Sequence, residues 1–306
     1  PEVLTPFPDG APEDRLGLAK WLTASDHPLL ARVTVNRYWQ MIFGRGLVST
    51  SEDFGMQGKP PSHPELLDWL ARDFVNSGWN LHHLLKKMVL SHTYRQESKI
   101  LPNAEEIDPE NLLLSRAPAY RLPAEMIRDS LLAHSGLLHK KIGGPGAKPY
   151  DLKVSFKPIN PDGAPNVYRR SVYTFWKRTG PTPVMMALDA SKRDVCTVRR
   201  ERTDSASQAL IMLNGTQFVE TARATADILI QNHGTTNPND LIEEAFKKLT
   251  SRSPSEQESK IIQNLLEEQK KYFTDDKETE KFLKVGYYKA KAKDKKYLAA
   301  VTSLVS

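Results

Sequence analysis

Apolar residues recur at helical spacing along much of this 306-residue chain. The pattern is clearest between residues 28 and 79, where two helical patterns flank a loop at 44–63 that is rich in glycine, proline and polar residues. In the first pattern, Ala31, Val35 and Ile42 fall on one side of a helix, which predicts a buried face. We expect the fold to be organised around this helix–loop–helix segment, with the polar loop presented by a helical scaffold.

The first helix of this segment also carries a polar stripe. Arg32, Asn36 and Gln40 follow one another at helical spacing, and Arg37 lies beside them. A helix that packs into a core would have apolar residues at these positions. We therefore expect the stripe to face a ligand or a polar partner, and the helix to begin near Asp26 or His27.

The second helix has a start signal in the sequence. Ser62 and Glu65 have the S-x-x-E spacing of a capping box and come directly before the apolar residues Leu66, Leu70 and Phe74. A Glu at the third position of such a box is explained by helix capping, so the pattern favours a structural role for Glu65 over a catalytic one.

The remaining helical patterns are spread over the rest of the chain. They lie at about 14–24, 80–88, 124–138, 205–213, 218–231 and 241–251. Capping boxes are predicted at 205–208 and at 253–256. The Lys-rich end, residues 284–306, is expected to present a solvated helix face.

One stretch favours a strand over a helix. Residues 171–177 (SVYTFWK) are aromatic and β-branched with two apolar faces, and they follow a loop rich in glycine and proline. The sequence thus predicts a mainly α, irregular multi-helix domain with a small central β element and a C-terminal helical segment. We expect a helical part at 1–138, a loop, strand and basic segment at 139–204 packed on the helices, and a helical part at 205–306.

The positive charge of the chain is concentrated in one place. The net charge is +6, and the stretch from Val167 to Arg202 holds nine Lys and Arg against three Asp and Glu, so it accounts for the whole excess. A local excess indicates a local anionic partner rather than a general attraction to polyanions. We refer to residues 167–202 as the basic segment.

Several arginines of this segment are candidate binding residues. A guanidinium group binds carboxylate, sulfate or phosphate through paired hydrogen bonds. One interpretation is that these arginines converge on a concave face and hold an anionic group; the other is that they pair with the protein's own carboxylates, such as Glu125 and Asp129. The candidate set is Asn36, Arg37, Arg45, Arg170, Arg178, Arg199 and Arg200.

Catalytic and metal-binding signals are sparse. Asp53 and His63 are the best acid–base pair, although their spacing does not establish that they meet. No H-E-x-x-H or Cys/His spacing occurs, so we expect no metal site, and the absence of C-x-x-C-H means that this chain cannot attach a c-type haem itself. With Cys196 as the single cysteine, no intrachain disulfide can form.

A family resemblance covers the chain from about Asp14 to Ala226. The stretches that carry it include DRLGLAKWL, NRYWQMIFGRGLV, SHTYRQES, YRRSVYTFWKRT, CTVRRERTDSASQALIMLN and FVETARA. In these stretches the chain resembles the planctomycete-type domain of unknown function that forms the C-terminal part of large proteins, many of which also carry a cytochrome c domain. The chain departs from the resemblance at RERTDSASQAL, where the usual pattern is RRTNTPLQAL.

The resemblance implies an extracytoplasmic protein with further domains as partners and with haem c, where present, outside this chain. It also implies a genetic setting of sulfatases and polysaccharide breakdown, but no established reaction. We therefore expect an accessory or binding module for anionic (sulfated or carboxylated) polysaccharide or for partner domains. The alternative is an enzyme acting on anionic polysaccharide; nucleic-acid binding is disfavoured because no such motif occurs, and no apolar run approaches the length of a membrane span.

Overall fold

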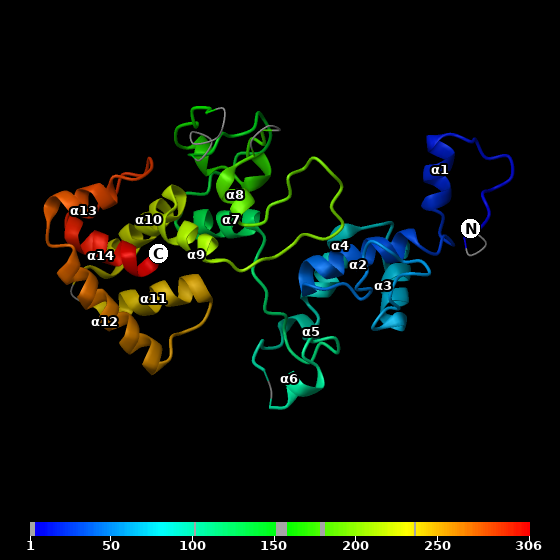
Figure 1. The fold of residues 1–306 in the computed structure, drawn as a ribbon, viewed down its shortest axis with the longest axis horizontal. Helices are drawn as coiled ribbons and strands as arrows, with labels where there is room; N and C mark the ends of the chain where they lie inside the picture. Colours follow the sequence, from blue (N-terminus) through cyan, green and yellow to red (C-terminus); the bar gives the residue numbers. More distant parts are fainter. Residues whose placement is uncertain (1–3, 101, 151–157, 178–180, 236) are drawn as a thin grey trace. The chain divides into compact units, whose positions relative to one another are not determined.

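A computed structural model describes residues 4–100, 102–150, 158–177, 181–235 and 237–306. It is mainly helical, as predicted (Figure 1). The chain divides into two compact units, one made of residues 1–121 and 197–199 and the other of residues 122–196 and 200–306. The three-part division expected from the sequence stays a prediction.

The first unit contains six described helices. They are α1 (Arg15–Leu22), α2 (Leu30–Phe43), α3 (Pro64–Asn76), α4 (Leu81–Val89), α5 (His92–Arg95) and α6 (Ala104–Ile107). Helix α2 packs against α3 and α4, and its Val35 is fully buried with Leu67 of α3 and Leu84 of α4. Trp39 and Phe43 stack one helical turn apart, with ring centroids separated by 4.0 Å.

The polar stripe of α2 holds the loop that follows it. Asn36 is 0% exposed; its amide nitrogen donates to the carbonyl oxygen of Val48 at 3.0 Å, and its amide oxygen accepts from the N–H of Val48 at 2.9 Å. The hydroxyl of Ser51 donates to the side chain of Gln40. Buried backbone groups need such partners, so this part of the stripe folds the polar loop onto α2.

Helix α3 starts one residue later than the predicted capping box requires. The N-cap is His63, which makes no side-chain capping bond, and Pro64 is the first helical residue. A residue that precedes proline is disfavoured in the helical conformation, so His63 could not occupy the first helical position that a Ser62 cap demands. The predicted Ser62–Glu65 box is therefore wrong, because the proline between its members sets the helix boundary.

Other predicted boundaries are partly confirmed. The capping box at Ser205 and Gln208 forms as expected. The last box lies at Ser255 and Glu258 instead of 253–256. Helix α2 begins at Leu30, later than predicted.

The second unit contains the remaining described helices. They are α7 (Ala124–His134), the 3-10 turns η2 (Asn166–Tyr168) and η3 (Ser171–Tyr173), α8 (Pro183–Ala187), α9 (Ala206–Asn214), α10 (Thr216–His233), α11 (Pro238–Thr250), α12 (Glu256–Tyr272), α13 (Asp276–Leu283) and α14 (Lys295–Val305). Helix α7 ends at His134, earlier than the predicted 138, because Gly136 takes a positive φ of 70° just after it.

The predicted strand at 171–177 does not form, and all of these residues are described by the structure. Residues Ser171–Tyr173 form η3, and the described pairing consists of isolated bridges, one of them between Ala147 and Thr174. The N–H of Ser171 donates to the Asp129 carboxylate at 2.8 Å, so a side chain of α7 takes up a backbone group that a strand would offer to a neighbouring strand. In this stretch the polar Ser171 and Thr174 are buried while Val172 is exposed, so its apolar composition does not mark a buried strand.

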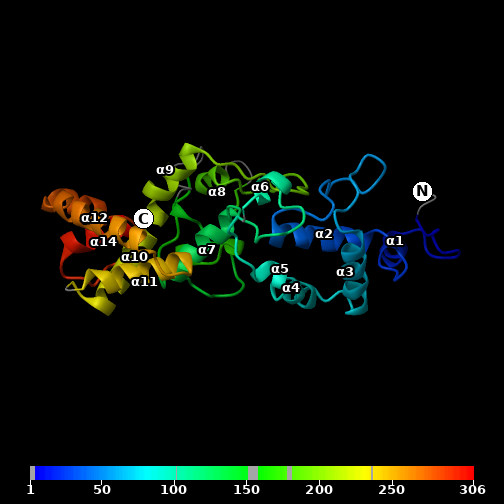
Figure 2. The same ribbon diagram turned by 90° about the horizontal axis from the view of Figure 1, so that it is seen from below.

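Helix α14 is central to the second unit. It packs against α10 and α12, as Figures 1 and 2 show, and buries Leu298 and Val301 with Leu229 of α10 and Leu266 of α12. The lysines of the Lys-rich end are exposed, as expected, but most of them precede the helix, and residues 297–302 of α14 are buried in the core. Among the described residues, no helix has the length and apolar character needed to cross a membrane.

We predict that Asn36→Ala destabilises the first unit by about 3 kcal/mol, because the buried backbone groups of Val48 lose their partners. Urea unfolding measures the change. The matched control is Arg37→Ala, the exposed neighbour on the same helix, for which we expect a change within about 0.5 kcal/mol. Equal effects of the two substitutions would contradict the anchoring role of Asn36.

Candidate functional site

The candidate residues of the first unit have separate environments. Arg37 and Arg199 are exposed, while Arg45 pairs with Glu110. Asn36 is used to hold the polar loop, as described above. In this unit the described contacts of Asn36 and Arg45 are thus with the protein itself.

Asp53 and His63 each bond within their own stretch of the loop. The Asp53 carboxylate accepts from the N–H of Gly55 at 2.7 Å, and the His63 ring nitrogen Nδ1 lies 3.0 Å from the Ser62 hydroxyl. No hydrogen bond joins these two described side chains to each other. Proton transfer needs groups within hydrogen-bond reach, so these contacts give the acid–base pair no support.

In the second unit, one predicted arginine is paired and another is exposed. Arg200 donates to Glu125 of α7 at 2.7 Å, which is the internal pairing foreseen as one of two interpretations. Arg170 is exposed, and Arg178 lies outside the described residues. Since the candidates are divided between the two units, their convergence on one face stays a prediction.

A charged face of α7 fixes the start of the basic segment. Arg128 is buried and donates to the carbonyl oxygens of Val167 at 2.6 Å and Arg169 at 2.8 Å. Asp129 of the same face accepts from the Ser171 hydroxyl at 2.7 Å. These contacts hold the backbone on both sides of Arg170, whose own side chain is directed to solvent.

Arg169 has the opposite orientation to its neighbour. It is buried, and its guanidinium group donates to the carbonyl oxygens of Pro145 at 2.8 Å and Gly143 at 2.6 Å while stacking on the Tyr173 ring at 4.0 Å. The basic segment therefore contains an inward arginine that organises the preceding loop and an outward one that is open to solvent.

Farther along the basic segment, an aromatic ring carries a cation. The Arg193 guanidinium lies 4.4 Å from the centroid of the half-buried Trp176 ring, and the indole N–H donates to the carbonyl oxygen of Lys192 at 2.8 Å. Both basic side chains are exposed. We call Trp176, Lys192 and Arg193 the Trp–Arg platform.

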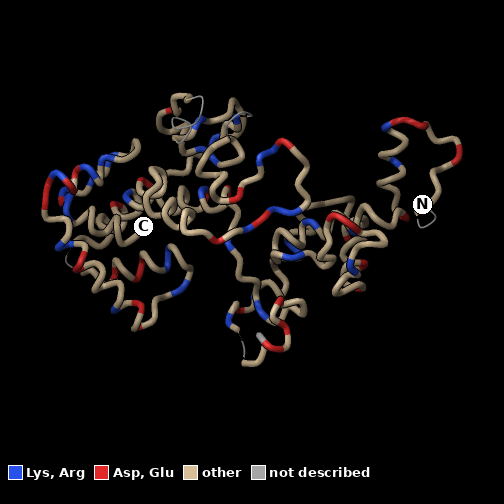
Figure 3. Tube along the Cα trace, in the orientation of Figure 1, with Lys and Arg blue, Asp and Glu red and all other residues tan. Residues whose placement is uncertain are grey.

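Of the acidic residues near this platform, Asp189 contacts the segment that leads into α9. Asp189 accepts from the backbone N–H of Thr203 at 2.7 Å and from the Gln208 amide at 3.3 Å, so its carboxylate fixes the entry to α9. Figure 3 shows Lys and Arg interleaved with Asp and Glu along the loop between α8 and α9.

A second group of charged residues, missed from the sequence, lies buried along α10. Glu220, Arg223 and Asp227 share one face of this helix and are 0%, 4% and 0% exposed. We call them the α10 cluster. The sequence does contain these charged residues at helical spacing, within FVETARATAD. Their hydrogen-bond partners come from distant parts of the chain, so no local pattern identifies the cluster.

Glu220 gathers donors from several segments. Its carboxylate accepts from the hydroxyl groups of Tyr150 and Tyr168, the latter at 2.8 Å, and from the backbone N–H groups of Tyr287 and Tyr288. A buried carboxylate is tolerated only when its oxygens are well supplied with hydrogen bonds. The loop before α14 is thereby tied to η2 through a single side chain.

Arg223 and Asp227 hold the rest of the same loop. The Arg223 guanidinium donates to the carbonyl oxygens of Val285 at 2.6 Å and Tyr288 at 2.8 Å. Asp227 accepts from the Tyr288 hydroxyl at 2.6 Å and from the N–H of Ala292 at 2.8 Å. We call residues 285–292, which lie in the connection from α13 to α14, the strap.

The protonation states of the cluster follow from its burial. Burial and the neighbouring Glu220 carboxylate raise the pKa of Tyr168, so its hydroxyl remains a donor across the working pH range. Burial alone would raise the pKa of Asp227, but hydrogen bonds from the Tyr288 hydroxyl and from backbone N–H groups of the strap outweigh it and lower that pKa. Asp227 is therefore charged in the folded protein at neutral pH.

The chemistry that this arrangement supports is anchoring. The Glu220 and Asp227 oxygens already accept hydrogen bonds from tyrosine hydroxyls and from the strap backbone. A general base needs an oxygen free to receive a substrate proton. Among the described residues, no group of His, Cys, Asp or Glu has an arrangement suited to a metal ion.

Comparison with known proteins gives a family without an assigned activity. The model of the PSD1 family, described as a protein of unknown function (DUF1553), matches residues 14–266. No curated protein matches the chain, and no solved structure does. The match covers most of both units.

We predict that Gly286→Ala destabilises the second unit by more than about 3 kcal/mol. Gly286 has a φ of 75°, and an added Cβ would lie 2.2 Å from the Glu220 carboxyl carbon, so the substitution would force the strap away from the cluster. Gly234→Ala is the matched control, because its φ of 69° is also positive and no atom lies within 4 Å of the new Cβ. We expect about 1 kcal/mol for the control in thermal or urea unfolding; equal costs would contradict the close approach.

A pH-dependent prediction follows from Asp227. Its folded-state pKa lies below the unfolded value near 3.9, so its stabilisation is present above that value and is lost as the pH falls through the folded-state pKa. Asp227→Asn should have a lower free energy of unfolding than the wild type at pH 7, and this difference should become smaller below about pH 4. Urea unfolding at pH 7 and pH 3 tests this, with the exposed Asp204→Asn as control; a gap that is the same at both pH values would be the contrary result.

Proposed function

The chain belongs to the PSD1 family of proteins of unknown function, and we propose that it is a non-catalytic binding module for anionic polysaccharide, sulfated or carboxylated. The proposed contact surface is the outward part of the basic segment, formed by Arg170 and the Trp–Arg platform. In this proposal the chain serves a larger extracytoplasmic protein, whose other domains are its partners and carry any haem.

The single observation that carries this proposal is the Trp–Arg platform with its exposed cations. Among the residues that the structure describes, no carboxylate forms an ion pair with Arg170, Lys192 or Arg193. Guanidinium and ammonium groups bind sulfate and carboxylate, and an indole ring offers an apolar surface beside them. An anionic sugar combines the same two features, a charged group and an apolar ring face.

The proposal of a non-catalytic role is supported by the hydrogen bonds and ion pairs that the acidic residues already make. The carboxylates of the α10 cluster are occupied by tyrosine hydroxyls and strap N–H groups, and Glu125 is paired with Arg200. Hydrolysis or elimination on a polysaccharide would need a carboxylate or histidine free to move a proton. The described contacts at the platform provide positive charge and an aromatic ring, which are suited to holding a polymer.

The test is a calorimetric titration of the chain with a sulfated dextran oligosaccharide at 150 mM salt. We expect saturable binding, and we expect Arg193→Ala and Arg170→Ala each to raise Kd about five- to tenfold, because each removes a charge-assisted contact. Lys260→Ala, an exposed lysine on α12 away from the basic segment, is the matched control and should leave Kd unchanged.

Two further ligands test whether binding is selective for a charged sugar. Neutral dextran should not bind, and single-stranded DNA of equal charge should bind more weakly than the sulfated sugar. Equal binding of the DNA with a steep salt dependence would identify a general polyanion site instead. Turnover of the sulfated oligosaccharide, measured by new reducing ends, would overturn the non-catalytic assignment.

A further inference from the structure

A row of lysines lies on the outer side of the strap. Lys289, Lys291 and Lys293 are exposed, and they alternate with Ala290 and Ala292, which are half-buried and pack against the core around α14. Successive side chains of an extended segment point to opposite sides, so the alanines face inward and the three lysines face solvent. We call these three lysines the lysine row.

The lysine row has no acidic counterpart. Residues 284–293 (KVGYYKAKAK) contain four lysines and no Asp or Glu. Among the described residues, no carboxylate forms an ion pair with the row; Glu280 and Asp276 of the neighbouring α13 pair with Lys295 and Lys296 of α14 instead. The positive charge of the row is therefore open to an outside partner.

Buried carboxylates on the inner side of the strap bind its backbone. Asp227 accepts from the N–H of Lys291 at 2.9 Å and from that of Ala292 at 2.8 Å, and Glu220 accepts from the N–H of Tyr288 at 2.6 Å. Both carboxylates are 0% exposed. They hold the segment that carries the row, so binding through the row would not have to pay for ordering that backbone.

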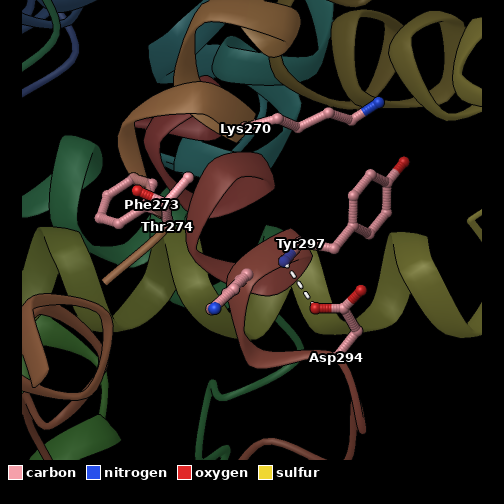
Figure 4. A pocket seen from close by; sticks show the side chains of 6 residues that line it. Lys270, Phe273, Thr274, Asp294 and Tyr297 are labelled. Atoms are coloured by element: carbon pink, nitrogen blue, oxygen red, sulfur yellow. Dashed lines mark hydrogen bonds between the residues drawn. The ribbon is translucent and has the colours of Figure 1, made fainter. Parts of the chain in front are cut away.

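The lysine row lies outside the pocket beside α14. Figure 4 shows this pocket, which is lined by Lys270, Phe273, Thr274, Asp294, Lys296 and Tyr297. Figure 3 shows Lys recurring along the connection between α13 and α14. Charges on the outside of a strap, separated by small alanines, do not enclose a single ion; they are suited to an extended surface that presents many negative charges.

The residue types of this segment favour a lipid surface. Recognition of one sulfate or phosphate group usually employs the planar fork of arginine, whereas a lysine ammonium is a hydrated point charge. A cluster of about four to eight basic residues on a surface segment is attracted to anionic lipid headgroups, and residues 284–293 reach this range. Tyr287 of the strap is 41% exposed, and such amphipathic rings are enriched where protein meets the headgroup region.

We propose that the lysine row is a peripheral docking surface for an anionic lipid bilayer. The ammonium groups lie near the lipid phosphates, and the alanines between them leave no large apolar side chain to insert, so attraction between charges holds the contact. The row lies beyond residue 266, where the family match ends. It is separate from the Trp–Arg platform, so it does not rest on the proposed polysaccharide binding.

The test is co-sedimentation of the full chain with phosphatidylcholine vesicles, either pure or containing about 30% phosphatidylglycerol. We expect binding to the anionic vesicles and none to the neutral ones. Binding should be lost at about 1 M salt, because the Debye length falls to about 3 Å. Absence of binding to the anionic vesicles, or equal binding to both kinds, would overturn the proposal.

A triple variant assigns the binding to the row. Lys289→Gln, Lys291→Gln and Lys293→Gln together should lower the vesicle partition coefficient about 100-fold, which is about fivefold for each ammonium group removed. The unfolding midpoint should stay at the wild-type value, because the ammonium groups of the row form no ion pair among the described residues. An unchanged partition coefficient would contradict the proposal.

A second triple variant is the matched control for net charge. Lys140→Gln, Lys260→Gln and Lys271→Gln remove the same charge from exposed positions outside the strap. We expect the partition coefficient to fall less than about threefold, because these positions do not lie in the row and long-range attraction is screened. Equal decreases for the two triple variants would show that net charge, and not the row, drives the binding.

The sulfated dextran oligosaccharide distinguishes a lipid surface from polyanions in general. The triple variant of the row should bind it with the wild-type Kd, since the proposed sugar contacts lie on the basic segment. If this variant lost affinity for the oligosaccharide to the same extent as for the vesicles, the row would be a general polyanion contact, and the lipid proposal would be wrong.

Discussion

The Glu220 carboxylate is the interaction on which the second unit depends most. It is fully buried on α10, and it accepts from tyrosines of the 139–168 loop and from the strap before α14. A charge in this position is stable only while those donors remain. The strap can approach because Gly286 has no side chain, and its course delivers α14 into the core.

Charged side chains have two different roles in this molecule, depending on whether they face inward or outward. Inward-facing groups such as Arg128, Arg169 and Asp227 hold backbone segments that form no sheet, so they replace the hydrogen bonds that a strand would supply. Outward-facing groups such as Arg170 and Arg193 are instead exposed to solvent. A binding role assigned to the outward groups is therefore compatible with a rigid interior whose acids are already occupied.

Much of the helical fold could be predicted from the sequence, because apolar spacing and capping residues act locally. The box at Ser205 is an example, and the failed box at Ser62 shows the same local rules, since Pro64 overrides it. The strand predicted at 171–177 was wrong because the Asp129 side chain and an isolated bridge to Ala147, rather than a neighbouring strand, contact its backbone. The α10 cluster was missed for a related reason: its partners lie far away in sequence, and only the folded chain brings them together.

The most direct test of this account is the Glu220→Gln variant, examined for both stability and binding. The account predicts a large decrease in the unfolding midpoint, because an amide cannot accept from all the donors that the carboxylate holds. It also predicts an unchanged Kd for the sulfated dextran oligosaccharide at a temperature where the variant is folded. A variant that keeps the wild-type midpoint, or one that is folded yet no longer binds, would contradict the division between inner anchors and outer binding surface.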